Sequence, residues 1–192
     1  IDTCYPEEKS FWYVKAPAFS FAKLNGMDAY LSPEMKSTGE AIGYDRKFPR
    51  AMYKALIASG VKMQNYGTVM VTLADEDKEE ALPLIRRFYE MGFNIEATVG
   101  TGEFLKAHGI RTRIRRKLSE NSTENLEAIR SGYVSYVINT RAILSGVHYE
   151  DGLAIRRTAI ENNVTMFTSL DTVKVLLDVL EEITIGVSPL YA

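Results

Sequence analysis

The sequence predicts an α/β protein in which helices cover both faces of a doubly wound, parallel sheet of five strands. From Tyr66 onward, short apolar strand patterns alternate regularly with amphipathic helix patterns, and this alternation is typical of parallel sheets. The chain has 192 residues, 46% of them hydrophobic and 25% charged, which suffices for one core of a globular protein. A less regular α/β segment precedes the sheet, so we expect two parts, residues 1–65 and residues 66–192.

The first part contains few periodic patterns. An aromatic run at Phe11–Val14 favours a strand, and an amphipathic pattern at Pro49–Ser59 predicts a helix that ends at Gly60. The stretch Leu31–Glu40 shows no clear period and is interpreted as irregular. We expect no separate core in this part of the chain.

The second part predicts strands and helices in alternation, without internal repeats or low-complexity runs. The strands are expected at Thr68–Leu73, Asn94–Ala97, Thr112–Ile114, Tyr133–Ile138 and Thr165–Phe167. The helices are expected at Lys78–Met91, Gly102–His108, Thr123–Arg130, Gly152–Asn162 and Asp171–Glu182.

Charge and cysteine content limit the classes of partner and compartment. The formal net charge of -2 provides no general attraction to nucleic acid, so any anion site must be a local cluster of basic residues. The single cysteine, Cys4, excludes an internal disulfide and is consistent with a reducing compartment, so we expect a cytoplasmic protein. The stretch Ile1–Ser10 is polar and acidic rather than signal-like, and no pattern indicates a membrane segment. The start at Ile1 favours a piece of a longer chain.

The stretch from Ile95 to Ile110 has the clearest local signature of a binding turn. A short apolar strand ends near Thr98 at a turn rich in hydroxyl groups and glycine, and a helix follows. Gly100 and Gly102 allow the backbone to approach a ligand, while Thr101 could cap the helix and offer its hydroxyl and amide to an anion. The turn is interpreted as a phosphate site, although a well-capped connection explains the same features equally well.

Polar residues also follow the other predicted strands. Because ligands of doubly wound sheets bind at the carboxyl ends of the strands, these residues form the candidate site. They include two lysines for charge, an asparagine that can bind a base or carbonyl edge, and several threonine hydroxyls. The candidates are Thr72, Lys78, Thr98, Gly100, Thr101, Lys117, Asn139 and Thr140. No histidine, cysteine pair or nucleophile stands among them, which favours binding over catalysis; caps and surface lysines are the simpler alternative.

Other motifs give weaker indications of a function. Gly100 and Gly102 lack the third glycine of a dinucleotide fingerprint, since Leu105 stands in its place, and no Walker sequence occurs. The acidic stretch Asp75–Asp77 is interpreted as a helix start rather than a metal site. The basic run Arg111–Lys117 is brief and lacks interleaved aromatic residues, so it indicates a local attraction for anions rather than a nucleic-acid surface.

Several stretches together resemble the carboxyl-terminal regulatory domain of the carbamoyl-phosphate synthetase large subunit, a methylglyoxal-synthase-like fold. They are Tyr66–Glu79, Gly92–Thr101, Tyr136–Thr140 and Ala154–Ala159, and the similarity extends to about Ile183. Upstream, three further stretches resemble the end of the second ATP-grasp domain of that subunit. They are Tyr13–Lys15, Phe21–Asp28 and Pro33–Glu40.

The resemblance implies a regulatory rather than a catalytic piece of a ligase. The family makes carbamoyl phosphate for pyrimidine and arginine biosynthesis from bicarbonate, two ATP and ammonia that a glutaminase small subunit releases from glutamine. ATP with Mg²⁺ or Mn²⁺ is used elsewhere in the large subunit, and this piece needs no cofactor. The terminal domain would bind a nucleoside monophosphate such as UMP or IMP as an allosteric effector.

The resemblance also assigns positions. The effector site of the family falls on residues that the strand-end argument already selects, with the lysines and Thr98 and Thr101 at the phosphate and Asn139 at the ribose or base. These positions are Thr72, Lys78, Thr98, Thr101, Lys117 and Asn139. Arg141 replaces a threonine of the bacterial pattern and either adds a phosphate contact or crowds the sugar. The positions that bind ornithine in some bacterial members hold Ala16 and Phe167, which offer no carboxylate to its ammonium groups.

Two other classes of function stay open. A free-standing methylglyoxal synthase, a lyase, has the same fold, but it needs an aspartate base and a His-Asp-x-x-Lys sequence after the first strand. This chain has Ala74–Lys78 there, with no histidine. An interaction or oligomerisation domain with an empty pocket is the other alternative.

Overall fold

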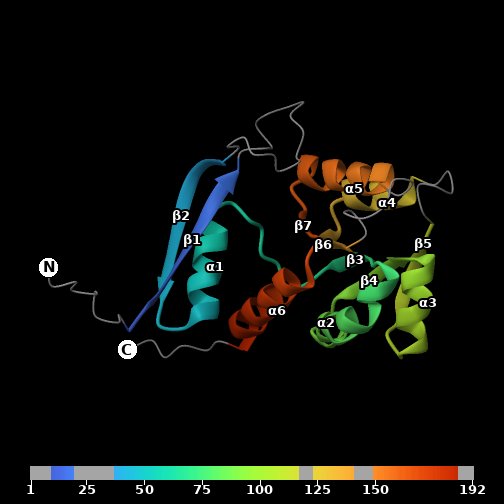
Figure 1. The fold of residues 1–192 in the computed structure, drawn as a ribbon, viewed down its shortest axis with the longest axis horizontal. Coiled ribbons are helices and arrows are strands. Elements are labelled where there is room, and N and C mark those ends of the chain that lie inside the picture. Colours follow the sequence, from blue (N-terminus) through green and yellow to red (C-terminus); the bar gives the residue numbers. More distant parts are fainter. Residues whose placement is uncertain (1–9, 20–36, 117–122, 141–148, 186–192) are drawn as a thin grey trace, which may run out of the picture.

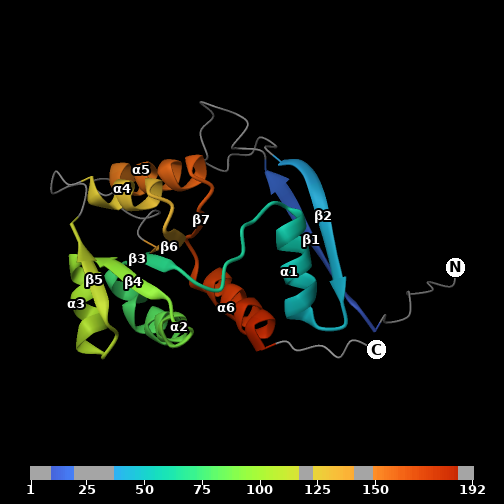
Figure 2. The ribbon, with the colours of Figure 1, turned by 180° about the vertical axis from the view of Figure 1, so that it is seen from behind.

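Two sheets organise the chain in the computed structural model, which describes residues 10–19, 37–116, 123–140 and 149–185 (Figure 1). The first is an antiparallel pair of β1 (Trp12–Phe19) and β2 (Ser37–Asp45), and α1 (Phe48–Ala58) lies against it. The second is a parallel sheet of five strands. Figure 2, seen from behind, shows α1 and α6 side by side between the two sheets.

The five-stranded sheet has the order β5-β4-β3-β6-β7, and all of its neighbouring strands run parallel. The strands are β3 (Thr68–Thr72), β4 (Asn94–Thr98), β5 (Thr112–Arg115), β6 (Val134–Asn139) and β7 (Thr165–Phe167). The chain moves outward from β3 to β5 and then returns to the other side of β3. The predicted doubly wound sheet of five parallel strands is therefore confirmed, with strand boundaries that differ by one residue.

Five helices cover this sheet, α2, α3 and α6 on one face and α4 and α5 on the other (Figures 1 and 2). They span Lys78–Glu90, Val99–Ala107, Glu124–Arg130, Tyr149–Glu161 and Leu170–Ile185 in the order α2 to α6. Successive strand residues point to opposite faces, so Val69 and Val71 of β3 join the core under α2 and α6, while Met70 joins the core under α5. In the described ranges, no helix is both long and apolar enough to cross a membrane.

Small residues bring α1 close to the antiparallel pair. Gly43 of β2 lies so near α1 that a Cβ at this position would overlap the carbonyl oxygen of Ala51 and would come within 3.0 Å of the Cα of Ala55. Both alanines and Ala16 of β1 are buried. The two hydrophobic core clusters of the described residues both belong to the parallel sheet. The stretch interpreted as irregular contains the start of a strand at Ser37; this expectation was wrong because the strand pairing is non-local.

Two polar connections join this first unit to the five-stranded sheet. The carboxylate of Glu182 in α6 accepts hydrogen bonds from Lys47 at 2.9 Å and from Arg50 at 3.0 Å, next to and within α1. The hydroxyl of Tyr136, fully buried in β6, accepts a hydrogen bond from the backbone N–H of Gln64 and donates one to its carbonyl oxygen, both at 2.7 Å. The segment between α1 and β3 is therefore held to the middle of the sheet.

Gly67 marks the point where this segment enters β3. Its φ is +114°, a conformation that residues with a Cβ rarely adopt, and a Cβ there would overlap the hydroxyl oxygen of Ser135. The same hydroxyl donates a hydrogen bond to the carbonyl of Tyr66 at 2.8 Å, and the carbonyl of Gly67 accepts one from Asn94 at 2.9 Å.

We predict that Tyr136→Phe lowers the free energy of unfolding by about 1–2 kcal/mol, because both hydrogen bonds to Gln64 are lost while the ring stays packed. Chemical denaturation measures this change. Tyr66→Phe, at a ring that is 68% exposed, is the matched control and leaves stability unchanged. An unchanged stability of Tyr136→Phe would show that the segment is held by other contacts.

We also predict a pH dependence that depends on this hydroxyl. Burial raises the pKa of Tyr136 from 10.0 to about 12, although its hydrogen bond with Gln64 acts in the opposite direction. The unfolded chain therefore loses this proton first, and stability falls by roughly 2 kcal/mol as the pH rises from 10 to 12. Unfolding curves across this range should show a smaller decline for Tyr136→Phe than for the unaltered protein.

Candidate functional site

Polar side chains form a row across three neighbouring strands at the carboxyl edge of the parallel sheet. Thr72 at the end of β3 pairs in register with Asn139 at the end of β6. On the other side, Val71 pairs with Ala97, so that Thr98 of β4 comes level with Thr72. Thr98 is 5% and Asn139 1% exposed, which shows that both are held inside this edge. With strands about 4.8 Å apart, the row spans roughly 10 Å.

Two further threonines hold the turn that follows β3. The hydroxyl oxygen of Thr101 accepts a hydrogen bond from the backbone N–H of Leu73 at 3.1 Å, and that of Thr140 accepts one from Ala74 at 3.0 Å. Both threonines are buried. Their oxygens therefore connect the end of β3 to the start of α3 and to the end of β6, which makes the edge a rigid frame.

The start of α3 differs from the sequence expectation. The helix begins at Val99 rather than Gly102, and its N-cap is Thr98, so the prediction that Thr101 caps the helix was wrong. The reason is the long-range bond to Leu73, which draws the Thr101 hydroxyl toward β3. No side-chain hydrogen bond caps the helix, so the amides of its first turn are available to an anion.

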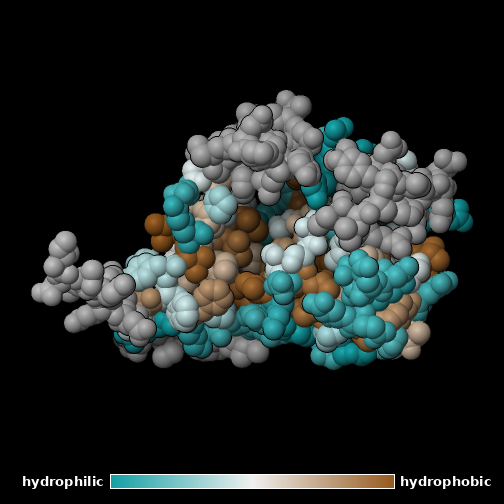
Figure 3. All heavy atoms as spheres, in the orientation of Figure 1, coloured by the Kyte–Doolittle hydropathy of each residue, from teal (hydrophilic) through white to brown (hydrophobic). Residues whose placement is uncertain are grey.

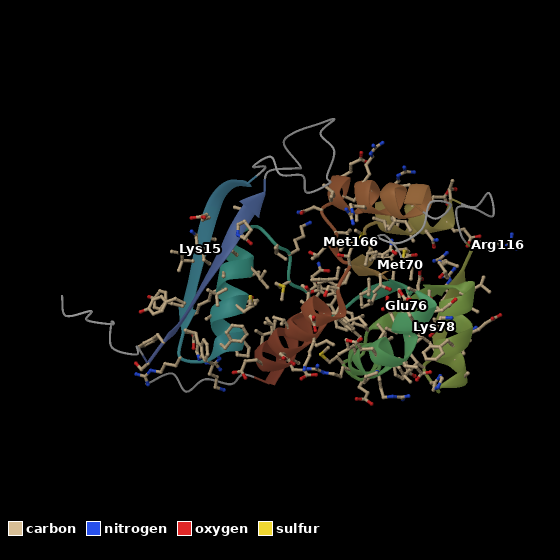
Figure 4. The ribbon with its side chains drawn as sticks, viewed as in Figure 1. Lys15, Met70, Glu76, Lys78, Arg116 and Met166 are labelled. Carbon is tan, nitrogen blue, oxygen red and sulfur yellow. The ribbon has the colours of Figure 1, made fainter. Side chains whose placement is uncertain are left out.

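Lys78 places a positive charge beside this helix start. It is the first residue of α2, its side chain is 19% exposed, and a Cβ built on Gly100 would lie 3.8 Å from its ammonium nitrogen. The ammonium pairs with Asp75 at 2.8 Å and lies 5.8 Å from the centre of the Phe104 ring. Figure 4 shows Lys78 near Glu76, at the start of α2. Because the Asp75 side chain is 76% exposed, water can take over its carboxylate when an anion approaches the lysine.

Asn139 carries a buried side-chain oxygen, Oδ1, that has no hydrogen-bond partner among the residues that the structure describes. An unpaired buried acceptor costs roughly 1–3 kcal/mol, so a donor that reaches this oxygen stabilises the complex. Asn125, in the first turn of α4, has the same property: its Nδ2 donates to the carbonyl of Arg116 at 3.0 Å, but its Oδ1 is unpaired within the described part of the chain. Asn125 escaped the sequence analysis, although an asparagine at a predicted helix start was visible.

The remaining candidates are placed as follows. Gly100 is exposed, in the first turn of α3. Lys117 and Arg141 lie outside the described residues; Arg116, exposed at the end of β5, is the described neighbour of Lys117 (Figure 4).

The two positions that the resemblance connects with ornithine lie in different sheets. Ala16 is buried in β1 of the antiparallel pair. Phe167 ends β7 of the parallel sheet, and its ring centre lies 6.2 Å from that of Tyr136. Neither supplies a carboxylate. Among the residues that the structure describes, no three histidine, cysteine, aspartate or glutamate side chains gather as a metal site.

We predict that Asn139→Leu leaves the unfolding free energy unchanged or raises it by up to about 1 kcal/mol, because the substitution removes an unpaired buried acceptor. Asn125→Leu is the matched control: it should lower stability by about 1 kcal/mol, since the Arg116 carbonyl loses its donor. Denaturation midpoints distinguish the two. A clear destabilisation by Asn139→Leu would show that the amide is needed for folding rather than for a ligand.

This chain is similar to known proteins over the region of the parallel sheet. Residues 80–168, from α2 to β7, match the family model of the MGS-like domain. The solved structure of methylglyoxal synthase from Elizabethkingia anophelis NUHP1 is similar to this chain with a TM-score of 0.48 and 16% sequence identity, over 60% of this chain and 79% of that one. The match to the MGS-like domain thus runs from the first turn of α2 to the residue that follows β7.

Proposed function

We propose that this chain is the carboxyl-terminal part of a carbamoyl-phosphate synthetase large subunit and that its parallel sheet binds an anionic effector, a nucleoside monophosphate such as UMP or IMP. One observation carries the proposal: the uncapped start of α3, the ammonium of Lys78 and the unpaired oxygen of Asn139 lie at the same edge of the sheet. The match of residues 80–168 to the MGS-like domain supports it.

The phosphate belongs at the start of α3. Backbone N–H groups and the positive end of the helix dipole attract an anion there, and Lys78 adds a full charge. Gly100 carries no side chain that could block the approach. Thr98 lies beneath the turn with a hydroxyl group that can donate a hydrogen bond. Lys117, just beyond β5, is the second cation that the proposal assigns to the phosphate.

The ribose or base belongs at the other end of the row, near Asn139. The distance of roughly 10 Å across three strands matches the separation between the phosphate and the base in a mononucleotide. The unpaired Oδ1 of Asn139 can accept a hydrogen bond from a ribose hydroxyl or a base N–H. Thr101 and Thr140 support the turn between these ends through their oxygens. Arg141 would contact the phosphate or the sugar.

Residues 1–65 are proposed to end an ATP-grasp domain whose remainder packs on β1 and β2. Figure 3 shows brown, hydrophobic residues among paler ones over the region of β1, β2 and α1. Large side chains of β1 and β2 are exposed to an unusual extent, including Tyr13 at 56%, Ile42 at 64% and Tyr44 at 57%. Their neighbours in the antiparallel register lie on the same outer face. In the full enzyme, the upstream domains would use ATP with Mg²⁺ or Mn²⁺, the glutaminase subunit would deliver ammonia, and the assembly would act in the cytoplasm.

An effector must favour one arrangement of the two units over another in order to regulate. Asn139 and Tyr136 belong to the same strand, and the hydroxyl of Tyr136 holds Gln64 of the segment between the units. A ligand that pulls on the end of β6 therefore acts on the strand that positions this segment. This continuity supports regulation through β6.

A free-standing methylglyoxal synthase is the second candidate, since the MGS-like match fits that enzyme equally well. The ion pair of Asp75 with Lys78 places a carboxylate and an ammonium at the phosphate end of the site, which are groups that a proton-abstracting lyase could use. The sequence Ala74–Lys78 nevertheless lacks the histidine of that enzyme. An interaction domain with an empty pocket would bind neither nucleotide nor triose phosphate.

We predict that Lys78→Ala weakens the binding of UMP or IMP by about tenfold to a hundredfold, because a charge-assisted hydrogen bond contributes roughly 1.5–3 kcal/mol. Lys117→Ala should have a similar effect. Calorimetric titration of the purified chain measures both, with Lys106→Ala as the control at an exposed lysine near the end of α3. Unchanged affinity in both variants, or no nucleotide binding by the unaltered chain, would contradict the proposed site.

We further predict that the chain does not convert dihydroxyacetone phosphate to methylglyoxal, since no histidine accompanies Asp75. A colorimetric assay for methylglyoxal, with an authentic synthase as positive control, tests this. If the chain did convert the substrate, Asp75→Asn should abolish turnover, whereas the control Asp171→Asn, on α6, should leave it intact. That result would establish a lyase in place of the regulatory domain.

A further inference from the structure

A cavity of about 920 Å³ opens at the end of the parallel sheet opposite the proposed nucleotide site. Thr68 and Asn94, the first residues of β3 and β4, line it, whereas the nucleotide site is formed by the last residues of these strands. The turn that follows α2 forms one wall, and Arg111, just before β5, lies on another side. The cavity therefore belongs to a different site.

The one carboxylate that lines the described part of the cavity is already paired. Glu96 is only 5% exposed, and its two oxygens accept hydrogen bonds from Arg115 at 2.9 and 3.1 Å. Arg115 also donates to the hydroxyl of Tyr133 at 2.7 Å. Hydrogen bonding with Glu96 raises the pKa of Arg115, and burial raises the pKa of Tyr133, so the arginine stays charged and the phenol neutral. Glu96 and Tyr133 line the cavity, and Arg115 connects the two from behind through its hydrogen bonds.

Two other arginines of the cavity keep most of their hydrogen-bonding capacity. The side chain of Arg113 is 69% exposed, and its nearest approach to Glu96 is 3.8 Å, which is too long for a hydrogen bond. Arg111 takes part in no ion pair among the described residues. Among the described residues that line the cavity, two arginines stand beside one carboxylate, which is already paired with Arg115, so this lining carries an excess of one positive charge.

The spacing and the walls define what fits. Arg113 belongs to β5 and Arg111 directly precedes it, and both line the cavity with Cα atoms about 7 Å apart. Tyr89 and Tyr133, which are 38% and 41% exposed, line the cavity with two aromatic rings. Flat apolar walls with two cations at one side suit a flat molecule with two acidic groups.

We propose that this cavity binds a small organic dianion, a flat apolar body with two acidic groups, through Arg111 and Arg113. The site is independent of the proposed nucleotide site and carries no catalytic group. Arg111 and Arg113 belong to the basic run that begins at Arg111. Arg115 of the same run is hydrogen-bonded to Glu96, whereas Arg113 comes no nearer to that carboxylate than 3.8 Å.

The test is a calorimetric titration of the 192-residue chain at low ionic strength with benzene-1,4-dicarboxylate, and with benzoate as the matched monoanion. The dicarboxylate should bind about tenfold more tightly than benzoate, since it engages a second guanidinium group. Arg111→Gln and Arg113→Gln should each reduce its affinity to about that of benzoate. Arg157→Gln, at an exposed arginine of α5, and Lys78→Ala should leave it unchanged.

Four results would overturn the proposal. Equal affinity for benzoate, inorganic phosphate and the dicarboxylate would indicate simple charge attraction. Full binding by both arginine variants, with unchanged denaturation midpoints, would place the ligand elsewhere. Loss of binding in Lys78→Ala would mean that the dianion occupies the nucleotide site. Tighter binding of an extended peptide with alternating glutamates than of the dicarboxylate would assign the arginines to pairing along the edge of β5.

Discussion

The right-handed connection between parallel strands is the constraint on which the arrangement of this molecule depends. Moving from β3 outward to β5, it places α2 and α3 on one face. After the return to β6, the same handedness places α5 on the other face. The turns after β3 and β6 therefore diverge, and the polar ends of these neighbouring strands face a common space. The row of polar residues from Thr98 to Asn139 therefore results from the order and handedness of the strand connections rather than from a local sequence motif.

Within this space, the polar groups divide into those that build the site and those that are left over for a ligand. The hydroxyl oxygens of Thr101 and Thr140 are used by the backbone of β3. Other polar groups keep hydrogen-bonding capacity within the described chain: the amides in the first turn of α3 and the side-chain oxygen of Asn139. Lys78 is paired with the exposed carboxylate of Asp75. Because the hydrogen bonds of Thr101 and Thr140 fix the surrounding backbone, the groups left for a ligand are held in place before it binds. This lowers the entropic cost of binding.

Much of the parallel sheet could be predicted, because runs such as Thr68–Thr72 combine β-branched residues with full burial. The ends of β4 and β6 also placed Thr98 and Asn139 correctly at the edge. The predictions that were wrong concern features that depend on contacts between residues distant in the sequence. β2 pairs with a strand far upstream, and the Thr101 hydroxyl bonds to a residue 28 positions away instead of capping its helix. The ion pair of Glu96 with Arg115 could not be predicted from the sequence pattern, because each residue alone is typical of a strand at the surface.

The entry of the chain into β3 has a consequence for heritable variation. At Gly67, the positive φ and the nearby hydroxyl of Ser135 both exclude a Cβ. The carbonyl of Tyr66 accepts a hydrogen bond from Ser135, and the carbonyl of Gly67 accepts one from Asn94. Every amino-acid replacement that a single base change produces in a glycine codon introduces a side chain. No single base change at this codon therefore gives a conservative substitution. A missense allele here would disturb the connection between the two units, although every residue that contacts a ligand would be unchanged.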